Sequence, residues 1–572
     1  MNLTRLLRMR PDELRTRLAQ AYTKRWGHPP GCRIVPCSGS PALPGPPCAP
    51  GDAAKIARHR FDLLGYRDLD FGDPIDWHFD PVHGKRAPRR PWHQIPFLDF
   101  DQIGDHKIIW ELNRHQHLVT LAQDGRFRDE IIAQWTHWQR ENPYPIGINW
   151  ASTLEVAFRA LSWLWVRNFL DDFHPDLLAA LHLHGWYIEH FLSTYFSPNT
   201  HLLGEGVALF AIGLLCPQLA EAPCWQARGW AIVLRQAETQ VRPDGFHFEQ
   251  SVYYHVYALD FFRFARGLAA TNGLAIPPSF DRTIEKMTEA LAVLSQAGLA
   301  ANFGDDDGGR VITPPAHPPA SHPPQPIGGI YTMAGLFIDA GPQGAFHAGH
   351  GHADALSIQL IADGRRVLID PGTYCYVCPD RDRFRGTAAH NTLQADGRDQ
   401  AEPAGPFAWK NLPEVTVDRW QTGENFDFFA GHHNGYRPVI HYRWVFGLKS
   451  RFWLVRDLVT GPGRHRLDIH WHFLDENDIA ILPPAGSEWS RAMERWDWSP
   501  AYGRKDPAFV LRFSNERELP AEFAVVLALD SPGAFTQTAP GAYRYEVAHG
   551  AHEFVFENSR FRYRCGGVEL TL

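Results

Sequence analysis

The sequence predicts an α+β protein of several domains, in which an N-terminal α/α toroid is followed by antiparallel β-sheets packed like a sandwich. Three observations support this fold class: a length of 572 residues, a helical hydrophobic period over about 100–300, and a period of two beyond a proline-rich stretch. We expect an N-terminal helix with a Pro/Gly-rich segment at 1–60, a toroid domain at 61–325 and a β-sheet domain at 326–572.

Apolar residues recur at three- and four-residue steps in the first half of the chain. Leu154, Ala157, Leu161 and Leu164 form one such series. Short loops separate the helical runs, so consecutive helices should be antiparallel neighbours. A long series of such hairpins must close or stack to bury its apolar faces, which favours a toroid or solenoid over a simple bundle. Comparable runs are found at 176–195, 201–215, 225–241, 248–272 and 280–298.

The hydrophobic period changes after the proline-rich stretch at 311–329, which can be neither helix interior nor central strand. In RLDIHWHFLDEN, at 466–477, three apolar residues alternate with His470 and His472. This alternation is typical of a strand with two different faces. The C-terminal part of the chain is therefore predicted to be a layered antiparallel β-structure.

Composition narrows the class of protein. With 44% hydrophobic and 21% charged residues the chain is globular, and a net charge of −8 argues against binding nucleic acid through the whole surface.

The N-terminal segment has no continuous apolar run and no other segment is suited to span a membrane, so we expect a cytoplasmic protein, with a periplasmic or exported one as the alternative. Cys375 and Cys378 form a lone CxxC without the second pair of a zinc ribbon. We expect mostly free thiols and one local disulfide.

A histidine cluster, HAGHGHADALS, occupies 347–357, just before a hairpin whose turn is predicted at Asp363-Gly364. His352 precedes the first strand of this hairpin and Asp370 ends the second, so both should lie at its open end. His390 precedes another short alternating run. Two imidazoles and a carboxylate at strand ends predict a zinc site, although each residue taken alone is more often structural.

His350 is separated from His352 by one glycine. If His352 binds a metal, His350 is held beside it while its own ring stays free to accept a proton. One histidine would then anchor the loop and its neighbour would take part in chemistry.

The helical half contributes further polar candidates. Asn199 stands at a helix start, with His201 and Glu205 four residues apart on one face. Tyr254 and His255 follow in a later helical run. Each residue also has a purely structural interpretation. Asn199 could be only a helix cap, His201 and Glu205 only a surface pair, and Tyr254 only a buried ring.

Seven segments in this order resemble the heparinase II/III-like polysaccharide lyases and their alginate-lyase relatives, over roughly 105–475. The resemblance implies a toroid followed by antiparallel sheets, an acidic polysaccharide or oligosaccharide as substrate, and no organic cofactor. The segments are WELNRHQHL (110–118), NWASTLEVAFRALSW (149–163), NTHLLGE (199–205), FEQSVYYH (248–255), HGHADALS (350–357), LIDPGTY (368–374) and FRGTAAHNTLQADGRDQ (384–400).

The resemblance also implies residue roles. Asn199, with His201 close by, would bind and neutralise a uronate carboxylate, and Tyr254 and His350 would be the catalytic tyrosine and histidine. Zn²⁺ would brace the loops of the site rather than act as a Lewis acid, held by His352, Asp370 and His390. The residues expected to contact substrate in the groove are Asn149, Trp150, Arg159, Glu205, Glu249, His255, Tyr374 and Arg385.

Such an enzyme would cleave the bond at C4 of a uronate by β-elimination, giving unsaturated uronyl products. If the C5 proton and O4 leave from the same side, Tyr254 could serve as base and acid; if they leave from opposite faces, His350 is the base and Tyr254 the acid. Tyrosine as a base requires its pKa to be lowered from about 10. Hyaluronan, chondroitin, heparan-type chains, alginate and bacterial capsules all remain candidate substrates.

Two other functions are kept open. A glycoside hydrolase of the α/α-toroid type could use paired carboxylates from the run at 305–307 with Glu205 or Glu249, although a solvated or cation-binding loop is the simpler reading of that run. A non-catalytic polysaccharide-binding protein linked to exopolysaccharide metabolism would keep the groove without turnover.

Overall fold

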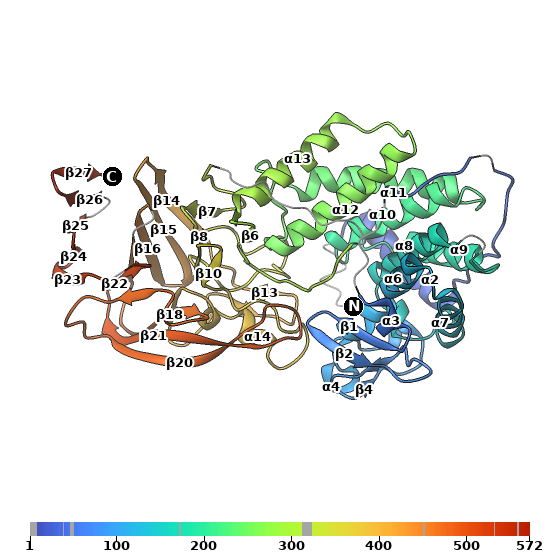
Figure 1. The fold of residues 1–572 in the computed structure, drawn as a ribbon, viewed down its shortest axis with the longest axis horizontal. Coiled ribbons are helices and arrows are strands. Elements are labelled where there is room, and N and C mark those ends of the chain that lie inside the picture. Colours follow the sequence, from blue (N-terminus) through green and yellow to red (C-terminus); the bar gives the residue numbers. More distant parts are fainter. Residues whose placement is uncertain are drawn as a thin grey trace.

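The computed structural model places the helices of the N-terminal half at one end of an elongated molecule and the strands of the C-terminal half at the other (Figure 1). It describes residues 9–37, 39–45, 51–170, 173–311, 323–449, 452–530, 532–557 and 560–572. Most of the proline-rich stretch at 311–329, and Cys48, lie outside these ranges. Within the described ranges, no helix has both the length and the apolar run that crossing a membrane requires.

The six helical runs that the hydrophobic period predicts are confirmed, with ends that differ by a few residues. They are α8 (Thr153–Phe169), α9 (Leu177–His190), α10 (Thr200–Leu215), α11 (Ala222–Gln240), α12 (Val252–Thr271) and α13 (Pro278–Val293). The other helices of the described residues are α2 (Pro11–Trp26), α3 (Ala53–Ile56), α4 (Phe100–Ile103), α5 (His106–Asn113), α6 (Gln116–Asp124), α7 (Arg128–Glu141) and α14 (Arg381–Arg385).

Helix α10 is the buried centre of the helical region, and it contacts α8, α9, α11 and α12. Glycines bring its backbone close to that of α11. A Cβ atom on Gly213 would lie 2.2 Å from the backbone nitrogen of Gln226, and one on Gly229 would lie 2.3 Å from the nitrogen of Phe210. Only glycine permits this approach. The close packing holds the N-terminus of α10, where Asn199 stands, at a defined position.

Where the structure describes the C-terminal half, it contains four antiparallel sheets of four or more strands. One contains β7 (Ile330–Met333), β8 (Leu336–Asp339), β9 (Ile358–Ala362) and β10 (Arg365–Leu368). A second contains β11 (Leu393–Ala395), β18 (Arg464–Phe473), β20 (Ser490–Trp498) and β21 (Asp506–Glu518). The third contains β14 (Val415–Thr422), β15 (Phe426–Tyr436), β16 (Val439–Leu448), β17 (Phe452–Thr460), β19 (Ala480–Leu482) and β22 (Ala521–Ala528). The fourth contains β23 (Ala534–Ala539), β24 (Ala542–Val547), β25 (Gly550–Glu557), β26 (Arg560–Cys565) and β27 (Val568–Thr571).

Short two-stranded pairs complete the strands. They are β1 (Arg60–Leu63) with β2 (Tyr66–Asp70), β3 (Phe79–Asp80) with β4 (Lys85–Arg86), β5 (Ser295–Gln296) with β6 (Leu299–Ala300), and β12 (Glu402–Pro403) with β13 (Trp409–Lys410). The structure thus confirms a helical N-terminal region followed by antiparallel sheets.

The predicted hairpin is present as β9 and β10. Asp363 and Gly364 have φ angles of 49° and 71°, the left-handed pair that a tight two-residue turn needs. The strand around His470 and His472 is also confirmed, but its two faces do not differ in exposure. Both histidines are buried in β18 because loops cover the second face, where His472 Nε2 lies 3.0 Å from the carbonyl oxygen of Ala388.

Two apolar clusters organise the β half, one between the first three sheets and one between the six-stranded and five-stranded sheets. A further cluster joins the two halves of the molecule. Val252 of α12 and Val293 of α13 pack with Ile330, Phe337 and Ile361 of the first sheet. This apolar contact brings the first turn of α12 against the loops of the hairpin region, and that junction contains the candidate site.

Candidate active site

The four predicted catalytic residues come from three segments that meet at this junction. Asn199 caps α10, and its Oδ1 accepts a hydrogen bond of 3.1 Å from the backbone N–H of His201. Tyr254 lies in the first turn of α12, and His350 lies in the loop between β8 and β9. Asn199 and His201 keep partial exposure, whereas Tyr254 and His350 are buried. The open side of the site is therefore at the start of α10.

The rings of Tyr254 and His350 are stacked, with centroids 3.8 Å apart and planes 20° from parallel. The Tyr254 hydroxyl donates to Asp307 Oδ2 at 3.2 Å and lies 2.8 Å from the hydroxyl of Tyr376. Burial and the Asp307 carboxylate raise the pKa of Tyr254 well above its usual value. This direction is opposite to the lowering that a tyrosine base requires, so the free site holds Tyr254 as a proton donor.

His350 is held by carboxylates at both ring nitrogens. Its Nδ1 lies 3.0 Å from Asp305 Oδ2, and its Nε2 lies 3.5 Å from Glu249 Oε2. Burial lowers the pKa of His350, but the hydrogen bond that its ring donates to Asp305 and the charge of Glu249 outweigh burial and raise the pKa overall. Asp305 orients the ring so that Nε2 faces Glu249.

Glu249 links the histidine to the start of α10. Its Oε2 accepts from Asn199 Nδ2 at 2.7 Å, and its Oε1 accepts from the backbone N–H and hydroxyl of Thr200. Burial raises its pKa. Both Glu249 oxygens already accept hydrogen bonds from the start of α10, and a carboxylate would repel the anionic substrate that we expect. Glu249 therefore fits the role of positioning Asn199 and His350 better than the predicted contact with substrate. His201 has its pKa lowered to about 4, mainly by burial and then by His350, so its imidazole is neutral at pH 7.

The acidic run at 305–307 is part of the site rather than a solvated loop. Asp305 is fully buried, bonds to His350 and to His352 Nε2 at 3.1 Å, and pairs with Arg381, whose Nη2 donates to Oδ2 at 2.7 Å. Asp307 pairs with Lys107 at 3.2 Å. These ion pairs occupy both carboxylates, so neither is free for the paired acid and base chemistry of a hydrolase. An apolar flank (Ala301, Phe303) before the run was the only sequence signal for burial.

The predicted metal ligands are brought together. The side chains of His352, Asp354, Asp370 and His390 offer ligand atoms that all lie within 4.8 Å of one another, and all four are buried. Asp354 was not predicted. His352 Nδ1, Asp354 Oδ2 and His390 Nε2 have no hydrogen-bond partner among the described residues. Buried polar atoms of this kind are normally satisfied, and two imidazoles with two carboxylates form a suitable donor set for a metal ion.

The second nitrogen of each histidine is already bound by a carboxylate. His352 Nε2 lies against Asp305, and His390 Nδ1 lies 3.0 Å from Asp370 Oδ2. Such partners fix the ring orientation of metal-binding histidines. The residues therefore fit a metal ion, and Asp305 joins this group directly to His350.

Several predicted groove residues are instead enclosed in the protein. Arg159 is fully buried over Trp138, with its guanidinium carbon 4.4 Å from the ring centroid, and donates to the carbonyl oxygen of Asn149 at 3.1 Å. Asn149 donates to Trp77, and the Trp150 indole donates to Asn142. These N–H donors have their acceptors inside the helical core, which does not fit a contact with substrate.

The remaining groove candidates are also tied elsewhere. Glu205 accepts from the backbone N–H and hydroxyl of Ser193, and His255 Nε2 lies 2.9 Å from the Met287 carbonyl oxygen. Arg385 binds the loop at 405–406 and Asp382. Tyr374 lies under the ammonium group of Lys505 at 4.2 Å from its ring centroid. The tyrosine that reaches Tyr254 is Tyr376, two residues further along.

Comparison with known proteins agrees with this fold. Residues 50–301 match the model of the heparinase II/III N-terminus, and residues 328–534 match that of the heparinase II/III-like C-terminal region. The class that the fold and these matches define is a polysaccharide lyase. The chain belongs to the heparinase II/III-like family.

Individual relatives are distant. A heparin-sulfate lyase of Pedobacter heparinus is 24% identical over 490 residues, which cover 74% of this chain and 68% of that protein. One of Bacteroides stercoris is 22% identical over 500 residues, covering 73% and 69%. The crystal structure of heparinase III superposes with a TM-score of 0.68 over 97% of this chain and 94% of that chain, at 16% identity. At this identity the structural likeness shows the fold alone.

Proposed function

We propose that this lyase cleaves a uronate-containing polysaccharide by β-elimination and releases unsaturated uronyl products. The observation that carries the proposal is the stacked Tyr254–His350 pair beside Asn199, because it combines a retained phenolic proton, an imidazole and an amide donor within one site. Heparan-sulfate-type glycosaminoglycans are the first candidate substrates, since the two relatives are named heparin-sulfate lyases.

Asn199 and His201 would bind the uronate carboxylate. Asn199 Nδ2 carries two hydrogens and gives one to Glu249, so the other can be donated to a substrate oxygen. The neutral His201 can donate one N–H. Hydrogen bonds to the carboxylate stabilise the negative charge that develops when the C5 proton leaves.

Tyr254 would be the acid and His350 the base. In its deprotonated form His350 would take the C5 proton at Nε2, the C–H electron pair would form the C4–C5 double bond, and the C4–O4 bond would break as O4 takes the Tyr254 proton. The retained proton of Tyr254 favours this assignment over a tyrosine that acts as both base and acid. The phenolate left on Tyr254 and the proton gained by His350 must be exchanged before the next turnover.

The metal ion held by His352, Asp354, Asp370 and His390 would be Zn²⁺, whose ligand preference these residues meet. When bound it would supply positive charge that braces the loops of the hairpin region. Asp305 contacts both His350 and His352, so fixing His352 on the metal would also hold Asp305 and the His350 ring in place.

The predicted cytoplasmic location stays a prediction. The Cys375–Cys378 disulfide is a reason to test it by cell fractionation, because the cytosol keeps most thiols reduced.

The test is ultraviolet absorbance of the unsaturated uronate during incubation with heparan sulfate, heparin, chondroitin, hyaluronan and alginate. We expect the signal to rise with at least one uronate polymer and Tyr254→Phe to abolish it while substrate binding is retained. New reducing ends without the ultraviolet signal would show hydrolysis and contradict the proposal. Binding without either product would instead support a non-catalytic polysaccharide-binding protein.

A further inference from the structure

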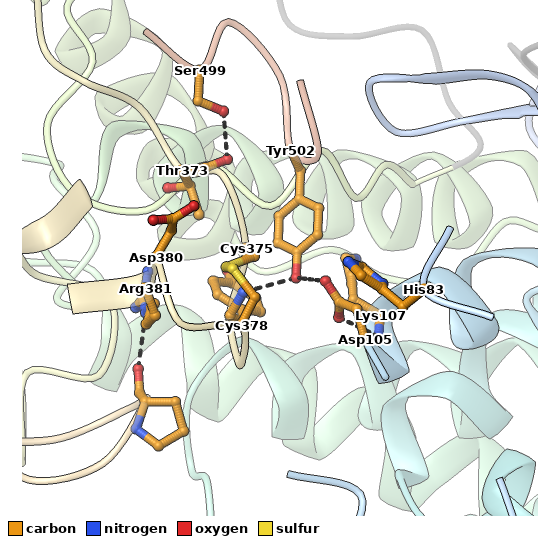
Figure 2. Close-up of a disulfide and its surroundings, with 12 residues drawn as sticks. His83, Asp105, Lys107, Thr373, Cys375, Cys378, Asp380, Arg381, Ser499 and Tyr502 are labelled. Atoms are coloured by element: carbon orange, nitrogen blue, oxygen red, sulfur yellow. Dashed lines mark hydrogen bonds between the residues drawn. A yellow bond between two sulfur atoms is a disulfide. The ribbon is translucent and has the colours of Figure 1, made fainter. Parts of the chain in front are cut away.

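A small disulfide loop borders the site. A disulfide joins Cys375 and Cys378, which have two residues between them in the sequence (Figure 2). Their Cα atoms are 5.9 Å apart, and both residues are buried. The predicted local disulfide is therefore present, while five other described cysteines carry free thiols. Tyr376 lies inside this loop, directly after Cys375.

Tyr376 is held from several sides. Its ring packs against Phe407 and Tyr502, with centroids 4.9 and 5.3 Å away, and the Arg381 guanidinium lies 5.0 Å from the ring centroid. Its backbone N–H donates to the Tyr502 hydroxyl at 2.9 Å. That hydroxyl in turn donates to Asp105 at 2.7 Å, the residue that caps α5 in the helical half (Figure 2). The loop is thus anchored in both halves of the molecule.

The direction of the bond between the two tyrosines follows from their other partners. The pKa of Asp307 is lowered, because the charge of Lys107 and then that of Arg114 outweigh burial, so Asp307 is a carboxylate and can only accept. The single proton of Tyr254 therefore points to Asp307 in the free site. The 2.8 Å contact between the hydroxyls then requires Tyr376 to donate to the Tyr254 oxygen.

We propose that Tyr376 is a positioning residue for the elimination, which donates a hydrogen bond to Tyr254, and that the Cys375–Cys378 disulfide holds it there. The proposal rests on the assignment of Tyr254 as the acid. When Tyr254 gives its proton to O4, negative charge forms on its oxygen beside the Asp307 carboxylate. The Tyr376 hydroxyl then donates to a charged rather than a neutral oxygen, so its hydrogen bond strengthens as the bond to O4 breaks.

The first experiment removes only the hydroxyl, in Tyr376→Phe. We expect kcat to fall by about 10- to 100-fold, because a hydrogen bond to a charged group is lost, while KM changes by less than about twofold. The matched control is Tyr442→Phe in β16, which also removes one phenolic oxygen, but in the six-stranded sheet, and should leave kcat unchanged. A kcat for Tyr376→Phe within about twofold of the wild type would overturn the proposal.

The second experiment opens the disulfide, in Cys375→Ser/Cys378→Ser and in the wild type treated with dithiothreitol. Dithiothreitol would reduce the bond to two thiols and itself become the cyclic disulfide; mass spectrometry after alkylation measures the extent. We expect both forms to lose kcat with KM retained, and dithiothreitol to have no further effect on the double variant. Full activity of a form shown to lack the bond would overturn the role of the disulfide.

A third measurement does not depend on turnover. A double-mutant cycle of Tyr254→Phe and Tyr376→Phe on the melting temperature should be non-additive, because either substitution removes the same hydrogen bond. Additive effects would contradict the contact itself. If the wild type forms no unsaturated product from any polymer while the cycle is non-additive, the proposed function fails and the contact stands.

Discussion

Asp305 shows how one residue can serve two sites. Its two oxygens bind His350, His352 and Arg381, so the candidate base and the candidate metal group share one carboxylate. An isolated acidic run gives no indication of such contacts, because solvated loops have the same composition. The burial of Asp305 is what separates it from Asp306, its partly exposed neighbour.

We predict that Asp305→Asn is both destabilising and strongly deleterious to activity. It leaves the Arg381 guanidinium buried without its counter-charge, which costs about 3–5 kcal/mol when a buried pair is broken. Thermal unfolding and the ultraviolet assay measure the two effects. Asp306→Asn is the matched control and should change both by much less. Equal effects of the two substitutions would contradict the assigned role.

Glu205 is a buried carboxyl group that should make the stability of the protein depend on pH. Burial raises its pKa to about 8, although the Ser193 hydroxyl and N–H oppose the shift. Because the folded-state pKa lies above the unfolded one, near 4.5, its contribution to stability is complete below pH 4.5 and is lost as the pH rises to about 8. The full loss is on the order of 5 kcal/mol.

The corresponding prediction concerns Glu205→Gln, which cannot ionise. Relative to this variant, the wild type should lose stability steadily between pH 5 and about pH 8 and then run parallel to it. Melting temperatures of both proteins across this range provide the measurement. A constant difference at all pH values would mean that Glu205 does not titrate over the predicted window.

At the scale of elements, the start of α10 combines two roles of Asn199. The side-chain oxygen caps the helix, and the side-chain nitrogen donates to Glu249. The cap alone would explain an asparagine at this position, since Asn, Asp and Ser all serve as N-caps. The two roles are separable because serine keeps a capping oxygen and lacks the amide N–H donors.

Asn199→Ser should therefore retain the melting temperature to within a few degrees and lower kcat/KM by about 10²–10³-fold, the cost of losing a donor to developing negative charge. Steady-state kinetics with the polymer that the panel identifies gives this ratio. Unchanged kinetics would mean that Asn199 is a helix cap only.

The hairpin of β9 and β10 is the second element that builds the site. Its turn at Asp363-Gly364 sets the register that places Asp370 beside His390. Asp370 and His390 are 20 residues apart, and the trio of His352, Asp370 and His390 was predicted from their places at strand ends and from the family resemblance. Asp354 was not predicted from the sequence as a metal ligand. Asp354 lies in the loop before β9, and the direction of its side chain depends on the path of that loop, which the sequence pattern does not give.

At the scale of the whole molecule, the site exists only where the two halves meet. Tyr254 and Asp307 come from the helical half and its connection, and His350 and Tyr376 come from loops of the β half. The cluster that includes Val252 and Phe337 holds these segments together. Anything that loosens the junction should therefore weaken catalysis before it unfolds either half.

We predict that the purified protein contains about one equivalent of Zn²⁺ and that His390→Ala loses it, as measured by elemental analysis. A ligand present at 100 times its dissociation constant stabilises the folded state by about 2.7 kcal/mol, so removing the metal with a chelator should lower the melting temperature by several degrees. His465→Ala, at the partly exposed start of β18, is the control and should keep the metal. An unchanged melting temperature after verified metal removal would contradict the bracing role.

The sequence by itself determined the elements and their order. Helical and strand periods, the Asp363-Gly364 turn and the cap at Asn199 are properties of short segments, and they follow from local steric and hydrophobic preferences. The motif order also indicated the family and four residues that the structure brings to one site. These inferences needed no knowledge of how the two halves pack.

Only the tertiary structure decided which polar residues face the site and which are enclosed. Arg159, Glu205 and Arg385 lie in segments with the right motifs, yet helix and loop packing turns them into the interior. Asp305 and Tyr376 lie 45 and 122 residues from their partners His350 and Tyr254. Contacts over such distances depend on the packing of whole domains, which no local pattern encodes.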